Sequence, residues 1–139
     1  MFKTVIDTNV IISAIAFGGI PREILNQLIT GKIYNYTSER ILNEIKEVFQ
    51  RPKFNYDIII IKAILHELEL ISEYIEEAKI SQTVGLIEGI VRDRNDTHIL
   101  ACALTAKTDF LITGDEDLLV LKKIRDTKIL TPAQFITDC

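Results

Sequence analysis

The sequence predicts an α/β fold in which a parallel β-sheet carries helices on both faces. Short apolar runs rich in β-branched residues alternate with longer stretches whose apolar residues recur at helical spacing. Strands separated by helices return by crossover connections and therefore pair in parallel. Two of the runs, 4–7 and 110–113, lead directly into carboxylates. Open parallel sheets place their ligands at the carboxyl ends of their strands, so these acids are candidates for a shared site.

The first part of the chain contains clear signals for the starts and ends of helices. Pro21 favours the start of a helix and Gly31 its end, after a break at 17–21. Ser38 is a strong N-cap candidate, and Pro52 limits the helix behind it because the residue before a proline disfavours helical backbone. The expected elements are a strand at 4–7, helices at 9–16 and 22–30, a strand at 32–37 and a helix from 39 to 51.

The second part alternates in the same way, apart from one stretch. Residues 74–91 show no clear period and are predicted to form short strands and loops. Residues 93–96 have the polar composition of a turn, and a helix with an apolar face at Ile99 and Leu104 follows. Thr131 is predicted to cap a terminal helix. The remaining expected elements are a helix at 57–72, a strand at 110–113, a short helix at 117–121 and a strand at 128–130.

The helix at 57–72 has an apolar face wider than a normal amphipathic stripe. Ile61, Ile64 and Leu68 lie on one face, and the run 58–60 together with Leu70 widens it. We expect this helix to be well buried. The alternative is a face shared with a partner chain, such as a second copy in a homodimer.

Composition limits the class of protein. A chain of 139 residues is long enough for one domain with its own core, and no apolar run approaches the ~20 residues of a membrane span. No signal peptide is visible. Cys102 and Cys139 show neither metal spacing nor a disulfide framework, which fits a reducing cytoplasm. The net charge of −4 argues against a broad basic nucleic-acid-binding face.

Five carboxylates stand where a pocket is expected. Asp7 ends the first strand, Asp115 and Asp117 follow the strand at 110–113, Asp96 opens the preceding helix, and Glu44 lies in the helix after Ser38. Taken singly, most have structural explanations as caps, turn residues or solvated side chains. Asp7 is harder to explain in this way, because a buried acid needs a partner and no Lys or Arg lies nearby in sequence.

Together these segments resemble the PIN-domain ribonucleases, and most closely the small prokaryotic PIN toxins of toxin–antitoxin pairs, which are VapC-like. The opening 6–10, Ile-Asp-Thr-Asn-Val, is similar to the start of that family, and Glu44 matches its second acid. The segment 93–101 resembles the third-acid segment, with Asp96 as the acid. The segment 111–119 resembles the closing motif, with Asp115 as the fourth acid. Residues 130–135 are similar to the C-terminal segment of the family's sequences.

The resemblance covers nearly the whole chain, so it implies a single PIN-like domain at 1–139 with a three-layer α/β/α sandwich. It also implies metal-dependent cleavage of single-stranded RNA and a possible antitoxin partner. Converging carboxylates repel unless a cation joins them, and oxygen ligands favour Mg²⁺ or Mn²⁺. The expected roles are metal ligands for Asp7, Asp96 and Asp115, water or second-ion binding for Glu44, an auxiliary ligand role for Asp117, and supporting or phosphate-positioning roles for Asn9 and Thr113.

Two rival classes have to be weighed. Metal-dependent phosphatases also place an acid at the end of their first strand, but they usually carry a second Asp two residues on, and Asn9 cannot transfer protons. A non-cleaving module that binds RNA or protein would not need all four acids. Among the neighbouring residues, Arg92 and Arg94 are interpreted as solvated, and His98 as a surface or capping histidine.

Overall fold

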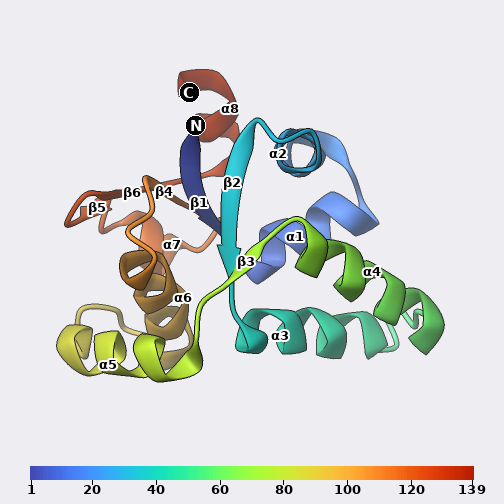
Figure 1. Cartoon of the computed structure of the whole chain (residues 1–139), viewed down its shortest axis with the longest axis horizontal. Coiled ribbons are helices and arrows are strands. Elements are labelled where there is room, and N and C mark those ends of the chain that lie inside the picture. The colour runs from blue at the N-terminus through green and yellow to red at the C-terminus, as the bar shows by residue number, and fades with distance from the viewer.

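A computed structural model describes residues 1–139. It confirms the α/β class: six strands form one sheet in the order β3-β2-β1-β4-β6-β5 (Figure 1). All neighbouring strands are parallel except β5 and β6, which pair antiparallel. The strands are β1 (Phe2–Ile6), β2 (Ile33–Thr37), β3 (Glu73–Tyr74), β4 (Phe110–Ile112), β5 (Lys123–Ile124) and β6 (Thr127–Leu130).

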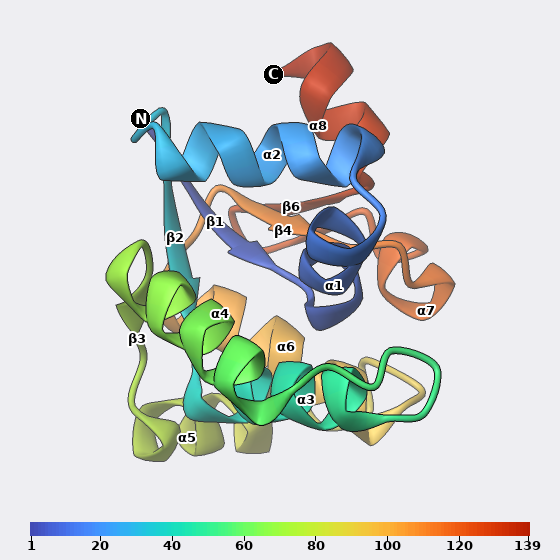
Figure 2. The same ribbon diagram turned by 90° about the vertical axis from the view of Figure 1, so that its right-hand side faces the viewer.

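Helices cover both faces of the sheet, which gives three layers. Helices α1, α2 and α8 lie on one face, whereas α6 packs on the other with α5 outside it (Figures 1 and 2). Helix α3 lies beyond the carboxyl end of β2 and contacts α1 and α4. The helices are α1 (Thr8–Ala16), α2 (Gly19–Ile29), α3 (Glu39–Gln50), α4 (Ile58–Leu70), α5 (Glu77–Ile87), α6 (Arg94–Thr105), α7 (Glu116–Leu119) and α8 (Pro132–Asp138).

The core forms where the central strands meet helix α6. A cluster of 29 buried residues includes Val5 of β1, Leu111 of β4 and residues 99–104 of α6. Small side chains such as Ala101 and Cys102 allow α6 to lie closely between the sheet and α5. Cys102 is therefore a core residue, and burial raises the pKa of its thiol to about 12. No helix combines the length and the apolar content needed to cross a membrane.

Helix α4 differs from the prediction of a well-buried helix. Only Ile61 and Leu68 are buried, whereas Ile59 is 75% exposed and Leu70 is 67% exposed. The helix packs on α3 and β3 along one side. The residues that widen its apolar face, 58–60 and Leu70, are therefore not covered by any other part of the chain. This is the arrangement expected under the alternative of a shared face.

The prediction of short strands and loops at 74–91 is wrong. Only β3 is a strand, and most of the segment is helix α5, which packs on α6. Its sequence shows little period because it buries only Ile80 and Ile87, and a hydrogen bond of 2.7 Å between the hydroxyls of Thr83 and Thr105 joins the two helices. Strand β5 was also not predicted, since two residues are too short to produce a pattern.

Candidate acidic site

The parallel register of the two central strands brings Asp7 and Thr113 together. Ile6 of β1 is paired with Ile112 of β4, so the residues that follow these strands are neighbours at the carboxyl edge of the sheet. The Asp7 N–H donates to the Ile112 carbonyl at 2.9 Å. The Thr113 hydroxyl, which is fully buried, donates to Asp7 Oδ2 at 2.7 Å. This bond fixes the orientation of the Asp7 carboxylate.

The same threonine orders the start of helix α7. Thr113 Oγ1 accepts from the Asp115 N–H at 3.0 Å, and Asp115 Oδ1 in turn accepts from the Asp117 N–H at 2.9 Å. Asp115 is thus the N-cap of α7, which begins at Glu116, one residue before the predicted start. Asp117 lies in the first turn, where a carboxylate also interacts favourably with the helix dipole.

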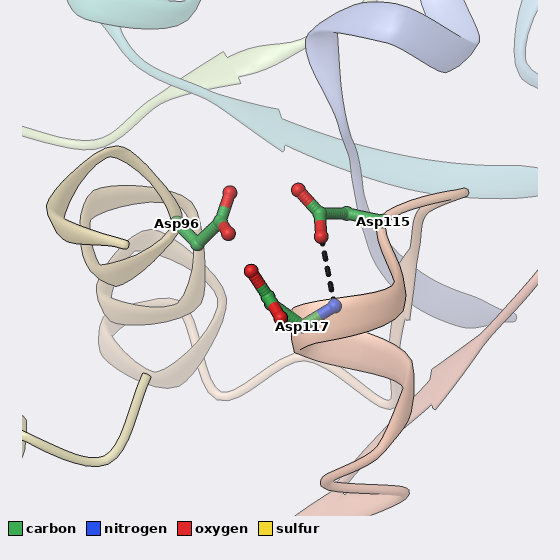
Figure 3. Close-up of side chains that lie close together, drawn as sticks. All are labelled: Asp96, Asp115 and Asp117. Atoms are coloured by element: carbon green, nitrogen blue, oxygen red, sulfur yellow. Dashed lines mark hydrogen bonds between the residues drawn. The ribbon is translucent and has the colours of Figure 1, made fainter. Parts of the chain in front are cut away.

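Asp96 comes from the first turn of α6 on the opposite side of the site. The predicted turn at 93–96 is in fact the beginning of this helix: Asp93 is the N-cap and accepts from the Asn95 N–H at 2.9 Å. Asp96 is only 9% exposed, and its Oδ2 has no hydrogen-bond partner. Carboxylate oxygens of Asp96, Asp115 and Asp117 all lie within 4.8 Å of one another and point toward a common centre (Figure 3).

Glu44 reaches the site from α3. The Thr8 hydroxyl, at the start of α1, donates to Glu44 Oε2 at 3.0 Å, while Arg40 Nε lies 3.6 Å from Glu44 Oε1. Thr8 was not among the predicted site residues, although its position directly after Asp7 was a usable signal. An open cleft of about 350 Å³ connects these elements. It is lined by Asp7, Thr8, Asn9, Glu44, Glu47, Val48, Arg51, Asn95, Asp96, His98, Ile99 and Asp115.

Asn9 and the two arginines that flank the acids are exposed, whereas His98 is buried. Asn9 is exposed at the cleft, and Arg92 and Arg94 are exposed as expected. The expectation of a surface or capping position for His98 is wrong, because it is only 6% exposed and its Nε2 lies 3.1 Å from Ser38 Oγ. Burial lowers the pKa of His98 and favours the neutral imidazole.

In the metal-free protein, burial and mutual repulsion oppose the ionisation of all the carboxyl groups in the site at once. Burial and then the neighbouring Asp115 carboxylate raise the pKa of Asp96 to about 7. Burial also raises the pKa of Asp7, although the Thr113 hydrogen bond partly offsets this effect. The cluster contains only oxygen donors, and one of them is buried without a partner. This donor set fits a hard divalent cation such as Mg²⁺ or Mn²⁺.

A pH dependence of stability follows from Asp96. Its folded pKa of about 7 exceeds the unfolded value, so the stability it contributes is present at low pH and is lost as pH rises toward about 7. The thermal midpoint of metal-free protein is therefore expected to fall between about pH 5 and about pH 8, and millimolar Mn²⁺ should raise it more at the higher pH. Differential scanning fluorimetry with and without EDTA measures both effects. In Asp96→Asn the pH dependence should weaken; an unchanged profile would contradict the assignment to Asp96.

Ser38 joins the two helices that carry Glu44 and Asp96. Its Oγ accepts from the Ile41 N–H at 3.2 Å as the N-cap of α3, and it contacts His98 of α6. Ser38→Ala should therefore lower the free energy of unfolding by about 2–4 kcal/mol, since it removes a cap and leaves a buried imidazole unpaired. Denaturant titration measures this. The exposed cap Asp57, which accepts from the Ile59 N–H, is the matched control, because Asp57→Ala should cost only about 0.5–2 kcal/mol.

The fold and the cleft together define an α/β protein with converging carboxylates at the carboxyl edge of a parallel sheet. The chain belongs to the PIN domain family, whose family model matches residues 3–117. It is similar to the uncharacterized protein MJ1680 of Methanocaldococcus jannaschii, with 33% identity over 98% of this chain and 90% of that protein.

Two solved structures share the fold. VapBC2 from Rickettsia felis, crystallised with a DNA fragment from its promoter, superposes with a TM-score of 0.67 at 18% identity, covering 93% of this chain and 98% of that one. VapC20 of Mycobacterium tuberculosis, a toxin that cleaves the sarcin-ricin loop, superposes with a TM-score of 0.61 at 14% identity, covering 90% and 98%. These likenesses establish a common architecture.

Proposed function

We propose that this protein is a divalent-metal-dependent endoribonuclease that cleaves single-stranded RNA as the toxin of a toxin–antitoxin pair. The observation that carries the proposal is the convergence of buried and half-buried carboxylates in one cleft, with Asp96 Oδ2 lacking any partner. Membership of the PIN domain family supports a nuclease. The structural neighbours, a VapBC complex and an RNA-cleaving VapC toxin, support the toxin role.

The proposed roles combine the resemblance to the PIN family with the contacts of each side chain. Asp7, Asp96 and Asp115 would hold Mg²⁺ or Mn²⁺, with Asp117 as an auxiliary ligand. The carboxylates of Asp96, Asp115 and Asp117 lie within 4.8 Å of one another, and Asp7 lines the same cleft. Thr113 fixes the Asp7 carboxylate, and Thr8 holds Glu44 so that it can position the attacking water or a second ion. Asn9, exposed in the cleft, is placed to contact a phosphate. When bound between these carboxylates, a divalent ion would supply Lewis-acid chemistry: it would activate a water molecule for attack and neutralise charge at the scissile phosphodiester.

The proposal also includes the domain organisation, the partners and the cellular location of the enzyme. We place residues 1–139 in a single PIN-like domain, a view supported by the one cluster of 29 core residues. The uncovered apolar side chains of α4 support a homodimer, and the VapBC neighbour supports a cognate antitoxin. Both cysteines are free, which fits a reducing cytoplasm.

The rival functions are less well supported. A phosphatase needs a proton-transferring group near Asp7, and the residue two positions on is Asn9. A module that only binds RNA or protein gives no reason for an unpaired buried carboxylate oxygen at Asp96.

A cleavage assay tests the proposal. Purified protein is incubated with a labelled single-stranded RNA and with the same strand in a perfect duplex, in Mn²⁺, Mg²⁺ or EDTA. We expect endonucleolytic products from the single strand with metal and none with EDTA. Hydrolysis of a phosphomonoester such as p-nitrophenyl phosphate, without RNA cleavage, would instead establish the phosphatase.

A further inference from the structure

A cluster of aromatic and basic residues lies at one end of the acidic cleft. We call Phe17, Arg51, Lys53 and Phe54 the aromatic rim. Arg51 lines the cleft itself, and its carbonyl accepts from the Phe54 N–H at 3.0 Å. Arg51, Lys53 and Phe54 belong to the loop that joins α3 to α4, so this part of the rim lies within one turn of backbone of the cleft wall, and Phe17 joins it from the end of α1.

The inner part of the rim is anchored to the core. Phe54 meets the fully buried ring of Phe49 edge to face, with 5.4 Å between ring centroids. Tyr56 stacks on the same ring at 4.7 Å and 9°, and its N–H donates to the Phe49 carbonyl. A surface anchored in this way is ordered before a ligand arrives, which lowers the entropic cost of binding.

The outer part of the rim is open to solvent. Phe17, at the end of α1, is 69% exposed, and its ring lies 6.0 Å from that of Phe54. Lys53 Nζ lies 5.9 Å and 5.6 Å from the centroids of these two rings. Neither Lys53 nor Arg51 forms an ion pair, since the one salt bridge of the chain joins Arg40 and Glu44.

We propose that the aromatic rim is a binding subsite for single-stranded RNA that extends from one end of the catalytic cleft. Phe17 stacks on a base, and Arg51 and Lys53 contact the phosphates that lead from that base to the cleft. Aromatic faces beside cations are the means by which proteins hold single strands without reading their sequence. The inference rests on the proposed ribonuclease function, because it names where the same substrate continues.

An RNA strand fits this surface better than a protein partner does. The rim is contiguous with the cleft and carries two free cations in a chain whose net charge is −4. A strongly apolar groove lies elsewhere, between α2 and α4, and no basic residue lines it. A protein segment with an apolar face matches that groove rather than the rim.

A tryptophan reporter tests direct stacking. The chain contains no tryptophan, so Phe17→Trp introduces a single fluorophore at the rim. Titration with a single-stranded oligoribonucleotide in EDTA should quench its fluorescence saturably. Phe2→Trp is the matched control, because Phe2 is 43% exposed at the opposite, amino end of β1. Equal quenching of both reporters, or none at position 17 while the RNA is bound, overturns the subsite.

Affinity measurements separate this inference from the proposed function. Phe17→Ala should weaken binding of a labelled single strand in EDTA by about 5- to 150-fold, the range for loss of one stacked base. Lys53→Gln should reduce the salt dependence of binding. Leu86→Ala, which removes a side chain that is 75% exposed on α5, should change neither the affinity nor the salt dependence of binding.

The possible outcomes distinguish the subsite from the nuclease function. Cleavage of RNA with unchanged affinity in Phe17→Ala overturns the subsite alone. A change only in dimer mass, measured by light scattering, shows that the rim is a protein interface and also overturns it. Base stacking in a protein that cleaves no RNA supports the subsite and overturns the nuclease.

Discussion

Asp7→Asn is expected to abolish metal-dependent RNA cleavage while leaving the fold intact. Asparagine retains the size of the side chain, and its Oδ1 can still accept the Thr113 hydroxyl. The substitution removes one negative charge from the carboxylates proposed to hold the metal. The loss of rate should exceed the 10- to 100-fold that is typical of groups that only orient a ligand.

The metal-free variant should be no less stable than the wild type. The pKa of Asp7 is raised chiefly by burial, so at neutral pH its charge lowers the stability of the metal-free fold, and asparagine removes that effect. Asp109→Asn is the matched control. Asp109 is an exposed carboxylate just before β4, at the other edge of the sheet, where it accepts the Lys3 N–H at 2.8 Å. Wild-type cleavage by Asp7→Asn, with normal metal dependence, would refute the proposed site.

The central sheet and most helices were predictable because their signals are local. β-branched runs, the N-caps Ser38 and Thr131 and the stop at Gly31 each determine their own neighbourhood. Helix α5 was missed because packing on α6, rather than a strong period of its own, stabilises it. For α4 the sequence left two possibilities open, a well-buried helix and a face shared with a partner chain, since an apolar pattern does not show what covers it.

The residues of the candidate site also divide into those that local sequence signals could place and those that depend on how the helices pack. Asp7 and Asp115 follow strands, so the rule that ligands lie at the carboxyl ends of parallel strands was sufficient to place them together. Glu44 and Asp96 come from helices, where each could equally be a cap or a solvated residue, and the resemblance to the PIN family was needed to give them a role in the site. The bond from Thr8 to Glu44, and the partnerless oxygen of Asp96, depend on how three helices meet. No pattern along the chain contains that information.

Asp115→Asn is expected to reduce RNA cleavage more than Asp117→Asn does. Asp115 lines the cleft and is close enough to Asp7 to contribute to the raised pKa of that residue. Asp117 does not line the cleft, although its carboxylate lies within 4.8 Å of those of Asp96 and Asp115. We therefore expect a loss of more than about 100-fold at position 115 and of about 10- to 100-fold at position 117, where the acid acts as an auxiliary ligand.

Stability provides the second measurement, because both acids stabilise the start of α7. Asn is a good N-cap, so Asp115→Asn should still accept the Asp117 N–H and keep the thermal midpoint of the metal-free protein. Asp117→Ala removes a carboxylate from the first turn of α7 and should cost about 0.3–1 kcal/mol of stability as well as rate.

Cleavage rates and thermal midpoints of the three variants are compared at one metal concentration. Equal losses of rate at the two positions would mean that both carboxylates serve the metal alike. A larger loss at Asp117 would show that the principal ligand comes from within α7 rather than from its N-cap.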